Sequence, residues 1–285
     1  MTTKLRSPIP DDAPAAGKIC HDAFKTIAEK HGFPPDFPAP EVAIGLMNHL
    51  VSRPDVYGVI AEDDGRVVGS NFLWEGDRVA GVGPITVEPT QQNGAIGRKL
   101  MEAVLARAQQ KKISAVRLVQ AAYHARSLSL YAKLGFVARE PLVAMHGTAI
   151  GTSSSGHAVR ASVEADRPAM DALCERVHGH NRSGEAGFAV AQGTAMVVEF
   201  DGVLVGYTTG IGFFGHSVAV TTDAMKALIA AAPSFPGPGF LIPIRQAELF
   251  RWCLEQGLRV VMPMTLMTVG PYSEPRGAFL PSILY

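Results

Sequence analysis

The chain has 285 residues, of which 47% are hydrophobic, and this is enough for the cores of two domains of ordinary size. Lys and Arg together number 26, as do Asp and Glu, so the formal net charge is zero. This balance speaks against nucleic acid or an anionic membrane as a partner, because both attract proteins that carry an excess of positive charge.

The N-terminus and the cysteines indicate the cellular compartment. The opening stretch MTTKLRSPIPDD reaches proline and acid before any apolar run, and no later run is long enough to span a bilayer. We therefore expect a soluble, cytoplasmic protein. Cys20, Cys174 and Cys253 are far apart and lack CxxC spacing, so we expect reduced core residues and no metal site.

The first half of the chain is predicted to have the order ααβββαβαβ. The evidence is apolar periodicity, punctuated by proline and glycine turns such as Asp63-Asp64-Gly65. The predicted elements are, in order, helices at 11–30 and 41–51, strands at 56–62, 67–74 and 79–87, a helix at 98–110, a strand at 115–120, a helix at 127–134 and a strand from 136.

The opening pattern returns after a Gly/Ser-rich segment, 151–156, which is typical of a flexible linker. Helix-capping preferences alone could explain repeated residues around the first helix, but not repeated residues around the hairpin turn as well. We therefore predict a duplication, with domains at 1–147 and 159–285 and a linker at 148–158. The matches are Arg6, Pro14 and Cys20 with Arg160, Pro168 and Cys174, at one common offset, and Asp64, Gly65 and Gly69 with Asp201, Gly202 and Gly206, at another.

The turn between the strand at 79–87 and the following helix has the composition of an anion site. The first N–H groups of a helix have no intrahelical partner, and the helix dipole favours negative charge, so a pyrophosphate can bind there without a metal. Gly94, Ala95 and Gly97 would let phosphates approach the backbone. The spacing fits neither GxxxxGK[ST] nor GxGxxG. An ordinary strand-to-helix turn is the alternative.

This turn resembles the acyl-CoA-binding motif of the GNAT acetyltransferases, Gln/Arg-x-x-Gly-x-Gly/Ala. Ala95 stands where the family usually has glycine, which costs little if its φ is negative but would tighten the phosphate turn if its φ is positive, with the neighbouring Gly94 as the residue that could compensate. The resemblance implies an α/β (α+β) fold of two GNAT-like domains, each a mixed, mainly antiparallel sheet flanked by helices, with acetyl-CoA as cofactor. The implied cofactor-binding residues are Ile85, Thr86, Val87, Gln92, Asn93, Gly94, Ala95, Ile96, Gly97, Arg98, His124 and Ser127.

A second segment, 127–136, resembles the family's motif Leu-Tyr-x-x-x-Gly-Phe. Tyr131 matches its tyrosine, whose phenol in the family lies beside the coenzyme's sulfur and protonates the leaving thiolate. A phenol suits this task, because it is a neutral proton donor at working pH. The alternative is a core aromatic residue. His124 stands where relatives often have an asparagine near the pantetheine, so it either makes that contact or is a solvent-facing helix residue.

A general base is harder to identify. Glu75, Glu88 and His124 lie near the expected site, yet each also has the character of a solvated surface residue. The apolar C-terminus should be docked, since free ends are usually polar. Some tandem relatives use a C-terminal carboxylate as base, which makes Tyr285 a candidate; a closing strand is the alternative.

The second copy has the pattern of a degenerate domain. Residues 221–226 replace the phosphate turn without glycine and carry Asp223, and no tyrosine matches Tyr131. The sequence thus predicts an acyl-CoA-dependent N-acyltransferase that moves an acetyl group to a primary amine of a small molecule or peptide by direct attack. A non-catalytic acyl-CoA-binding sensor or scaffold is the alternative. The acceptor and the oligomeric state stay open.

Overall fold

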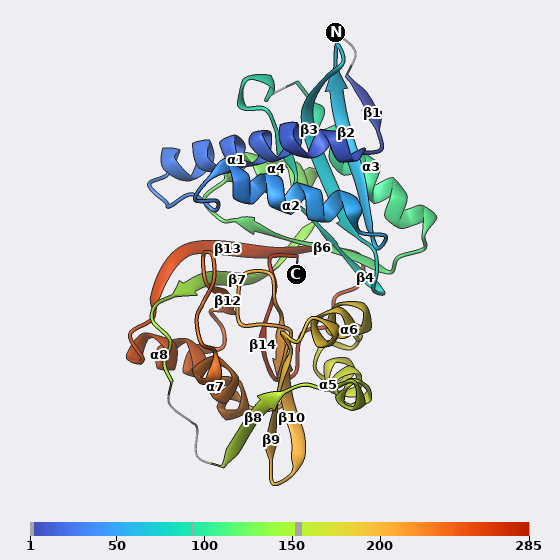
Figure 1. Cartoon of the computed structure of the whole chain (residues 1–285). Helices are drawn as coiled ribbons and strands as arrows, with labels where there is room; N and C mark the ends of the chain where they lie inside the picture. The colour runs from blue at the N-terminus through green and yellow to red at the C-terminus, as the bar shows by residue number, and fades with distance from the viewer. Residues whose placement is uncertain (1–2, 93, 152–155, 285) are drawn as a thin grey trace. The chain divides into compact units, whose positions relative to one another are not determined.

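The computed structural model describes residues 3–92, 94–151 and 156–284, which form two compact units (Figure 1). The first unit contains the chain up to Leu118 and the segment Tyr123–Phe136. The second unit contains Val119–Ala122 and the chain from Val137 onward. Both units combine helices with mainly antiparallel strands, which confirms the predicted α/β class.

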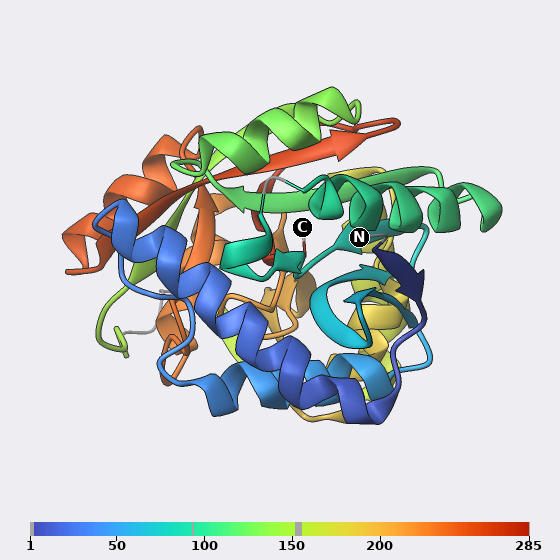
Figure 2. The same cartoon turned by 90° about the horizontal axis from the view of Figure 1, so that it is seen from above.

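In the first unit, helices cover both faces of a twisted hairpin. α1 and α2 lie side by side on one face of β2 and β3, and α3 lies on the other face (Figure 2). The strand order is β1-β2-β3-β4-β6, with β4 and β6 parallel and the other neighbours antiparallel. The elements are β1 (Lys4–Arg6), α1 (Ala13–Lys30), α2 (Pro40–Ser52), β2 (Val56–Asp63), β3 (Arg66–Trp74), β4 (Val79–Val82), β5 (Thr86–Val87), α3 (Ile96–Gln110), β6 (Ala115–Ala121) and α4 (Ala125–Lys133).

The core of the first unit lies between α1, α2 and the hairpin, where Cys20, Met47 and Phe72 are fully buried. α1 and α2 approach each other closely at Gly17, because a Cβ there would lie 2.5 Å from the Cα of Ile44. Any larger residue at this position would push the helices apart.

Two sequence predictions for this unit were wrong in detail. The strand β1 was missed, since three residues carry too short a pattern to detect. The single strand expected at 79–87 is two strands, because Gly83 and Pro84 interrupt it and proline has no N–H for a ladder. Both pieces pair with β3: β4 lies opposite Leu73 and Trp74, and β5 opposite Gly69 and Ser70.

The second unit contains an antiparallel sheet in the order β14-β11-β10-β9-β8, with helices on both faces. Successive side chains of β9 point to opposite faces of this sheet. Val197 packs with α5 and α6 on one face, and Val198 packs with α7 on the other. The elements are β7 (Val137–His146), β8 (His157–Ala161), α5 (Arg167–His178), α6 (Ser183–Ala191), β9 (Met196–Phe200), β10 (Val203–Thr208), β11 (Ser217–Ala219), α7 (Thr222–Ala231), β12 (Phe240–Pro243), α8 (Ala247–Glu255), β13 (Arg259–Val269) and β14 (Ala278–Leu280).

The strand β7 precedes the expected linker in sequence but pairs with strands that follow it. It runs antiparallel to β13 on one side and to β12 on the other. Chain contacts therefore group β7 with the second half. The division into 1–147, 148–158 and 159–285 stays a prediction about the duplicated sequence, and residues 152–155 of that linker lie outside the described residues.

The predicted duplication has a counterpart in an arginine on the first strand of each half. Arg6 donates to both oxygens of Asp12 at 2.7 and 2.8 Å and to Glu62 at 2.6 Å. Arg160 donates to Asp166 at 2.7 and 2.9 Å and to Glu199 at 2.6 Å. The same ion network thus recurs at the spacing that the sequence match predicts.

The hairpin turns repeat as well. Asp64 and Gly65 have φ values of 48° and 76°, and Asp201 and Gly202 have values of 51° and 76°. Both turns are therefore left-handed at two successive residues, a conformation that asparagine, aspartate and glycine adopt most readily.

Candidate active site

The turn between β5 and α3 leaves the start of the helix without a capping side chain. Ala95 is the N-cap of α3, makes no side-chain hydrogen bond, and is followed by a first turn without acidic residues. Its φ of 62° is left-handed, the more strained of the two possibilities that the sequence left open. The first N–H groups of α3 are therefore open to an anion. Asn93 lies outside the described residues.

Two contacts connect this turn with α4. Gln92 donates from Nε2 to the carbonyl of Val87 at 3.1 Å, and its Oε1 accepts a hydrogen bond from Arg126. A Cβ placed on Gly97 would lie 3.6 Å from a methyl carbon of Leu130. Sequence reasoning missed Arg126, because a surface arginine on a helix carries no signal of its partner.

The strand β5 has one edge that pairs with β3 and one edge that pairs with no strand of the described chain. Thr86 is buried and its hydroxyl lies 3.3 Å from that of Ser70. β4, by contrast, pairs with β6. The sheet therefore opens next to Ile85, Thr86 and Val87, where an extended ligand can add main-chain hydrogen bonds as a further strand would.

Tyr131 lies on α4, is 7% exposed, and has its ring 6.1 Å from that of Phe136. Burial raises the pKa of its phenol, so the hydroxyl is protonated at neutral pH. The structure records no hydrogen-bond partner for this hydroxyl among the described residues. Tyr131 thus combines the packing of a core residue with a proton that is available for donation.

His124 caps the N-terminus of α4. Its Nδ1 accepts from the N–H of Ser127 at 3.4 Å, and the Ser127 hydroxyl donates to the His124 carbonyl at 2.9 Å. Burial, followed by the charge of Arg126, lowers the pKa of His124 to about 4, so the ring is neutral at physiological pH. His124 is therefore a half-buried cap rather than a solvent-facing residue within the helix.

The two carboxylates considered as bases are held in ion pairs. Glu75 accepts from Arg107 at 2.6 and 2.8 Å, and the hydrogen bond with Arg107 lowers its pKa. Glu88 lies 3.0 Å from Arg66. A lowered pKa makes a carboxylate a weaker base, so Glu75 is poorly suited to the role. Tyr285 lies outside the described residues.

The second unit lacks the features that open the first. Thr221 caps α7 by accepting from the N–H of Ala224 at 3.2 Å, and Asp223 in the first turn pairs with Lys226 at 3.0 Å. Cys253 occupies in α8 the position that Tyr131 occupies in α4. In both helices the carbonyl of this residue accepts a hydrogen bond from the N–H five positions later, at 3.1 Å for Cys253 and 3.0 Å for Tyr131. At the start of α7 an anion would therefore find the N–H of Ala224 already bonded to Thr221 and would be repelled by the charge of Asp223.

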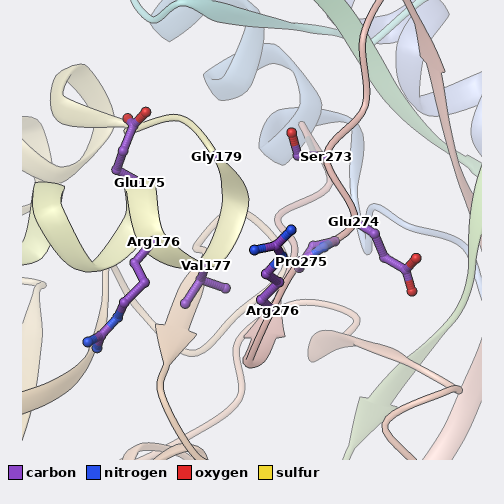
Figure 3. A pocket seen from close by; sticks show the side chains of 8 residues that line it. All are labelled: Glu175, Arg176, Val177, Gly179, Ser273, Glu274, Pro275 and Arg276. Carbon is purple, nitrogen blue, oxygen red and sulfur yellow. The ribbon is translucent and has the colours of Figure 1, made fainter.

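A pocket of about 620 Å³ lies in the second unit and is lined by none of the residues described above. Figure 3 shows that Glu175 and Arg176 project to different sides of α5 and that Glu274 points away from both. Its charged groups do not converge on one point, so this pocket is not the candidate site. It is lined by Glu175, Arg176, Val177, Gly179, Ser273, Glu274, Pro275 and Arg276.

Comparison with known proteins gives matches that include the segment described above. The model of the acetyltransferase (GNAT) family matches residues 23–136. The IAA acetyltransferase of Azospirillum brasilense is 34% identical over 102 residues, which are 33% of this chain and 66% of that protein. GNAT acetyltransferases take the acetyl group from acetyl-CoA, as the sequence resemblance implied.

Solved structures show a similar fold over nearly the whole chain. A protein from Pyrococcus horikoshii thought to be an acetyltransferase has a TM-score of 0.74 at 17% identity, covering 97% of this chain and 94% of its own. A tandem GNAT protein from the clavulanic acid biosynthesis pathway has a TM-score of 0.57 at 12% identity, covering 95% and 100%. Within the described ranges no helix is both long enough and apolar enough to cross a membrane. Residues 23–136 therefore match the model of the acetyltransferase (GNAT) family, within a chain whose fold is similar to that of a tandem GNAT protein.

Proposed function

We propose that this chain transfers an acetyl group from acetyl-CoA to a primary amine by direct attack, using the first unit alone for the cofactor. The observation that carries the proposal is the uncapped start of α3, which lies beside the helix of Tyr131. The α7 start in the second unit is closed by Thr221 and Asp223. Only one of the two copies thus offers an anion site of this kind among the described residues.

The residues around the turn fit the cofactor's chemical groups. The backbone of Gly94 to Arg98 would hold the pyrophosphate, since this stretch presents N–H groups at a helix start without a competing carboxylate. Gln92 fixes the preceding loop by its bond to Val87. The free edge of Ile85, Thr86 and Val87 would bind the pantetheine amides and orient the thioester carbonyl.

Tyr131 would complete the reaction as general acid. The thioester supplies an activated acetyl group, and attack by the neutral amine forms a C–N bond while the C–S bond breaks. Tyr131 then donates its proton to the departing sulfur, and the proton released by the amine restores the phenol directly or through water. The raised pKa of Tyr131 suits a donor that must stay protonated until sulfur leaves.

The proton that an ammonium ion must lose before it can attack has no assigned acceptor in the described site. Glu75 and Glu88 are paired with arginines, and His124 has a pKa of about 4 and accepts from Ser127 through Nδ1. We propose that the amine arrives in its neutral form, so that the only proton it loses at the site is the one released after attack, which restores the phenol of Tyr131. The Tyr285 carboxylate as base stays a prediction.

The test is thiol release by the purified full-length chain, with acetyl-CoA and a panel of amines, amino acids and peptides. We expect amine-dependent release of coenzyme A together with the acetylated amine, detected by mass spectrometry. Tight binding of acetyl-CoA without amine-dependent release would instead support a sensor or scaffold. Absence of acetyl-CoA binding would overturn both functions.

A further inference from the structure

Two contacts made by α4 lie on either side of the open start of α3. Arg126 donates a hydrogen bond to Gln92, which comes before the turn, and Leu130 packs against Gly97, which comes after it. Arg126 and Leu130 are four residues apart in α4 and therefore lie on the same face of that helix. Tyr131 directly follows Leu130. The helix that carries the proposed acid is thus joined to both sides of the phosphate turn.

The side chain of Gln92 is bonded at both ends of its amide. Nε2 donates to the carbonyl of Val87 at 3.1 Å, and Oε1 accepts from Arg126. Because Val87 is the last residue of β5, this one side chain connects the end of the strand, the turn and the first turn of α4. Without Arg126, the amide would keep only its bond to Val87 among the described residues.

The contact at Gly97 cannot by itself hold the turn in one orientation. It is an ordinary van der Waals contact, with 3.6 Å between a Cβ placed on the glycine and the methyl carbon of Leu130. Such a contact is weak and has no preferred direction. A hydrogen bond from a guanidinium is directional and stronger. The bond from Arg126 to Gln92 is therefore the contact that fixes the turn against α4.

Arg126 occupies a position at which a positive charge does not stabilise its own helix. It is exposed and lies in the first turn of α4, at the end where the helix dipole is also positive. Burial, followed by the charge of Arg126, lowers the pKa of His124, the cap of the same helix. Helix stability thus gives no reason for an arginine here, whereas the contact with Gln92 does.

We propose that Arg126 is a positioning residue for the cofactor. Through Gln92 it holds the turn in the conformation that receives the pyrophosphate, so that a cofactor bound there presents its thioester to Tyr131. A turn that is already fixed loses less conformational entropy when the phosphates bind. In this role Arg126 contacts neither the phosphates nor the reacting atoms. The inference rests on the proposed function, because it concerns the cofactor of that same site.

The first experiment measures binding without acetyl transfer, by calorimetric titration of the full-length chain with coenzyme A. Arg126→Ala and Gln92→Ala should each weaken binding about 10-fold, and the double variant should bind no more weakly than Gln92→Ala alone, because Arg126 acts through Gln92. Lys133→Ala is the matched control, since it removes the same charge from an exposed position in the last turn of α4 and should leave binding unchanged.

Two results of this titration would overturn the inference. One is equal affinity for coenzyme A in Arg126→Ala and Lys133→Ala, which would show that Arg126 has no part in binding. The other is a double variant in which the two losses multiply, because independent effects indicate that Arg126 contacts a phosphate itself rather than acting through Gln92.

The second experiment compares two acyl donors in the thiol-release assay. S-acetylpantetheine carries the same thioester as acetyl-CoA but no phosphate, so it does not use the turn. Arg126→Ala should lower kcat/KM for acetyl-CoA about 10-fold and leave kcat/KM for S-acetylpantetheine unchanged. Equal losses with both donors would show general damage to the unit and overturn the inference. Absence of thiol release by the unmodified chain with every amine would contradict the proposed function instead, while the titration would still decide the role of Arg126.

Discussion

Leu130 on α4 packs against Gly97 at the start of α3, where a Cβ on the glycine would lie 3.6 Å from the leucine methyl carbon. This distance is an ordinary van der Waals contact, so a small side chain fits at position 97 without moving α4. What a substitution changes there is the charge and bulk presented to an anion, and this makes Gly97 a direct probe of the phosphate turn.

Gly97→Asp should raise KM for acetyl-CoA by about 10-fold or more and leave the fold intact, because a carboxylate at the start of α3 repels phosphate. Steady-state kinetics and circular dichroism test this. Gly45→Asp is the control: it adds the same charge on α2, where nothing lies within 4 Å of the new Cβ. Equal KM values in both variants would remove the phosphate role of the turn.

Tyr131→Phe should lower kcat by about 100-fold while KM for acetyl-CoA changes little, because the ring still packs but no longer donates a proton. Tyr57→Phe, which removes a phenol from β2 elsewhere in the first unit, should keep its turnover. If kcat of Tyr131→Phe stays within a small factor of the unmodified chain, another group or water protonates the sulfur.

Ala95→Gly should stabilise the chain by up to about 1 kcal/mol, because glycine adopts the left-handed φ of 62° without the clash of a Cβ. Ala95→Val should destabilise it, since a branched side chain is worse there than alanine. Urea unfolding measures both changes. The opposite order of stability would show that Ala95 is not left-handed in solution.

The Arg160–Asp166 network should make part of the chain's stability sensitive to acid. Hydrogen bonds from Arg160 lower the pKa of Asp166 to about 2, against about 3.9 in an unfolded chain. A lowered folded-state pKa means that the contribution is present above the unfolded value and is lost as pH falls through about 2. It should not exceed about 1 kcal/mol, because Arg160 is 41% exposed.

Urea unfolding of the unmodified chain and of Asp166→Asn, from pH 6 down to the lowest pH at which the chain folds, measures this contribution. The difference in unfolding free energy between the two should be largest at pH 6 and shrink below pH 4. A difference that stays constant over this range would show that the pKa of Asp166 is not lowered.

A second ion network, in the core of the second unit, should matter more for stability. Glu185 bonds with Arg182 and lies 2.8 Å from Nδ1 of His216, whose Nε2 lies 2.8 Å from the Tyr207 hydroxyl. Burial alone would raise the pKa of Glu185, but the charges of Arg182 and His216 outweigh it and lower the pKa to about 2. The carboxylate is therefore ionised at neutral pH.

Glu185→Gln should destabilise the chain by about 3 kcal/mol, because Arg182, only 4% exposed, would lose its charge partner in the core. Glu199→Gln, which removes one carboxylate from an arginine that is 41% exposed and keeps Asp166 as a partner, should cost less than about 1 kcal/mol. Denaturant unfolding compares the two. Equal losses would show that Glu185 is no more than a surface partner.

The sequence by itself determined those features that arise from interactions between residues close together along the chain. The two Asp-Gly turns, at Asp64 and Asp201, need only the local preference of these residues for left-handed backbone. The strand-to-helix turn before α3 and the motif around Tyr131 could also be recognised from the sequence, because the residues of each lie next to one another along the chain. The matched spacing of Arg6 and Arg160 indicated a duplication before any contact was known.

The tertiary structure decided what depends on residues far apart in the chain. The sign of φ at Ala95, the pairing of β7 with β12 and β13, and the bond from Arg126 to Gln92 all follow from packing between distant segments. Local propensities cannot specify such contacts, because their free energy arises only when the whole core has formed and buried the groups together.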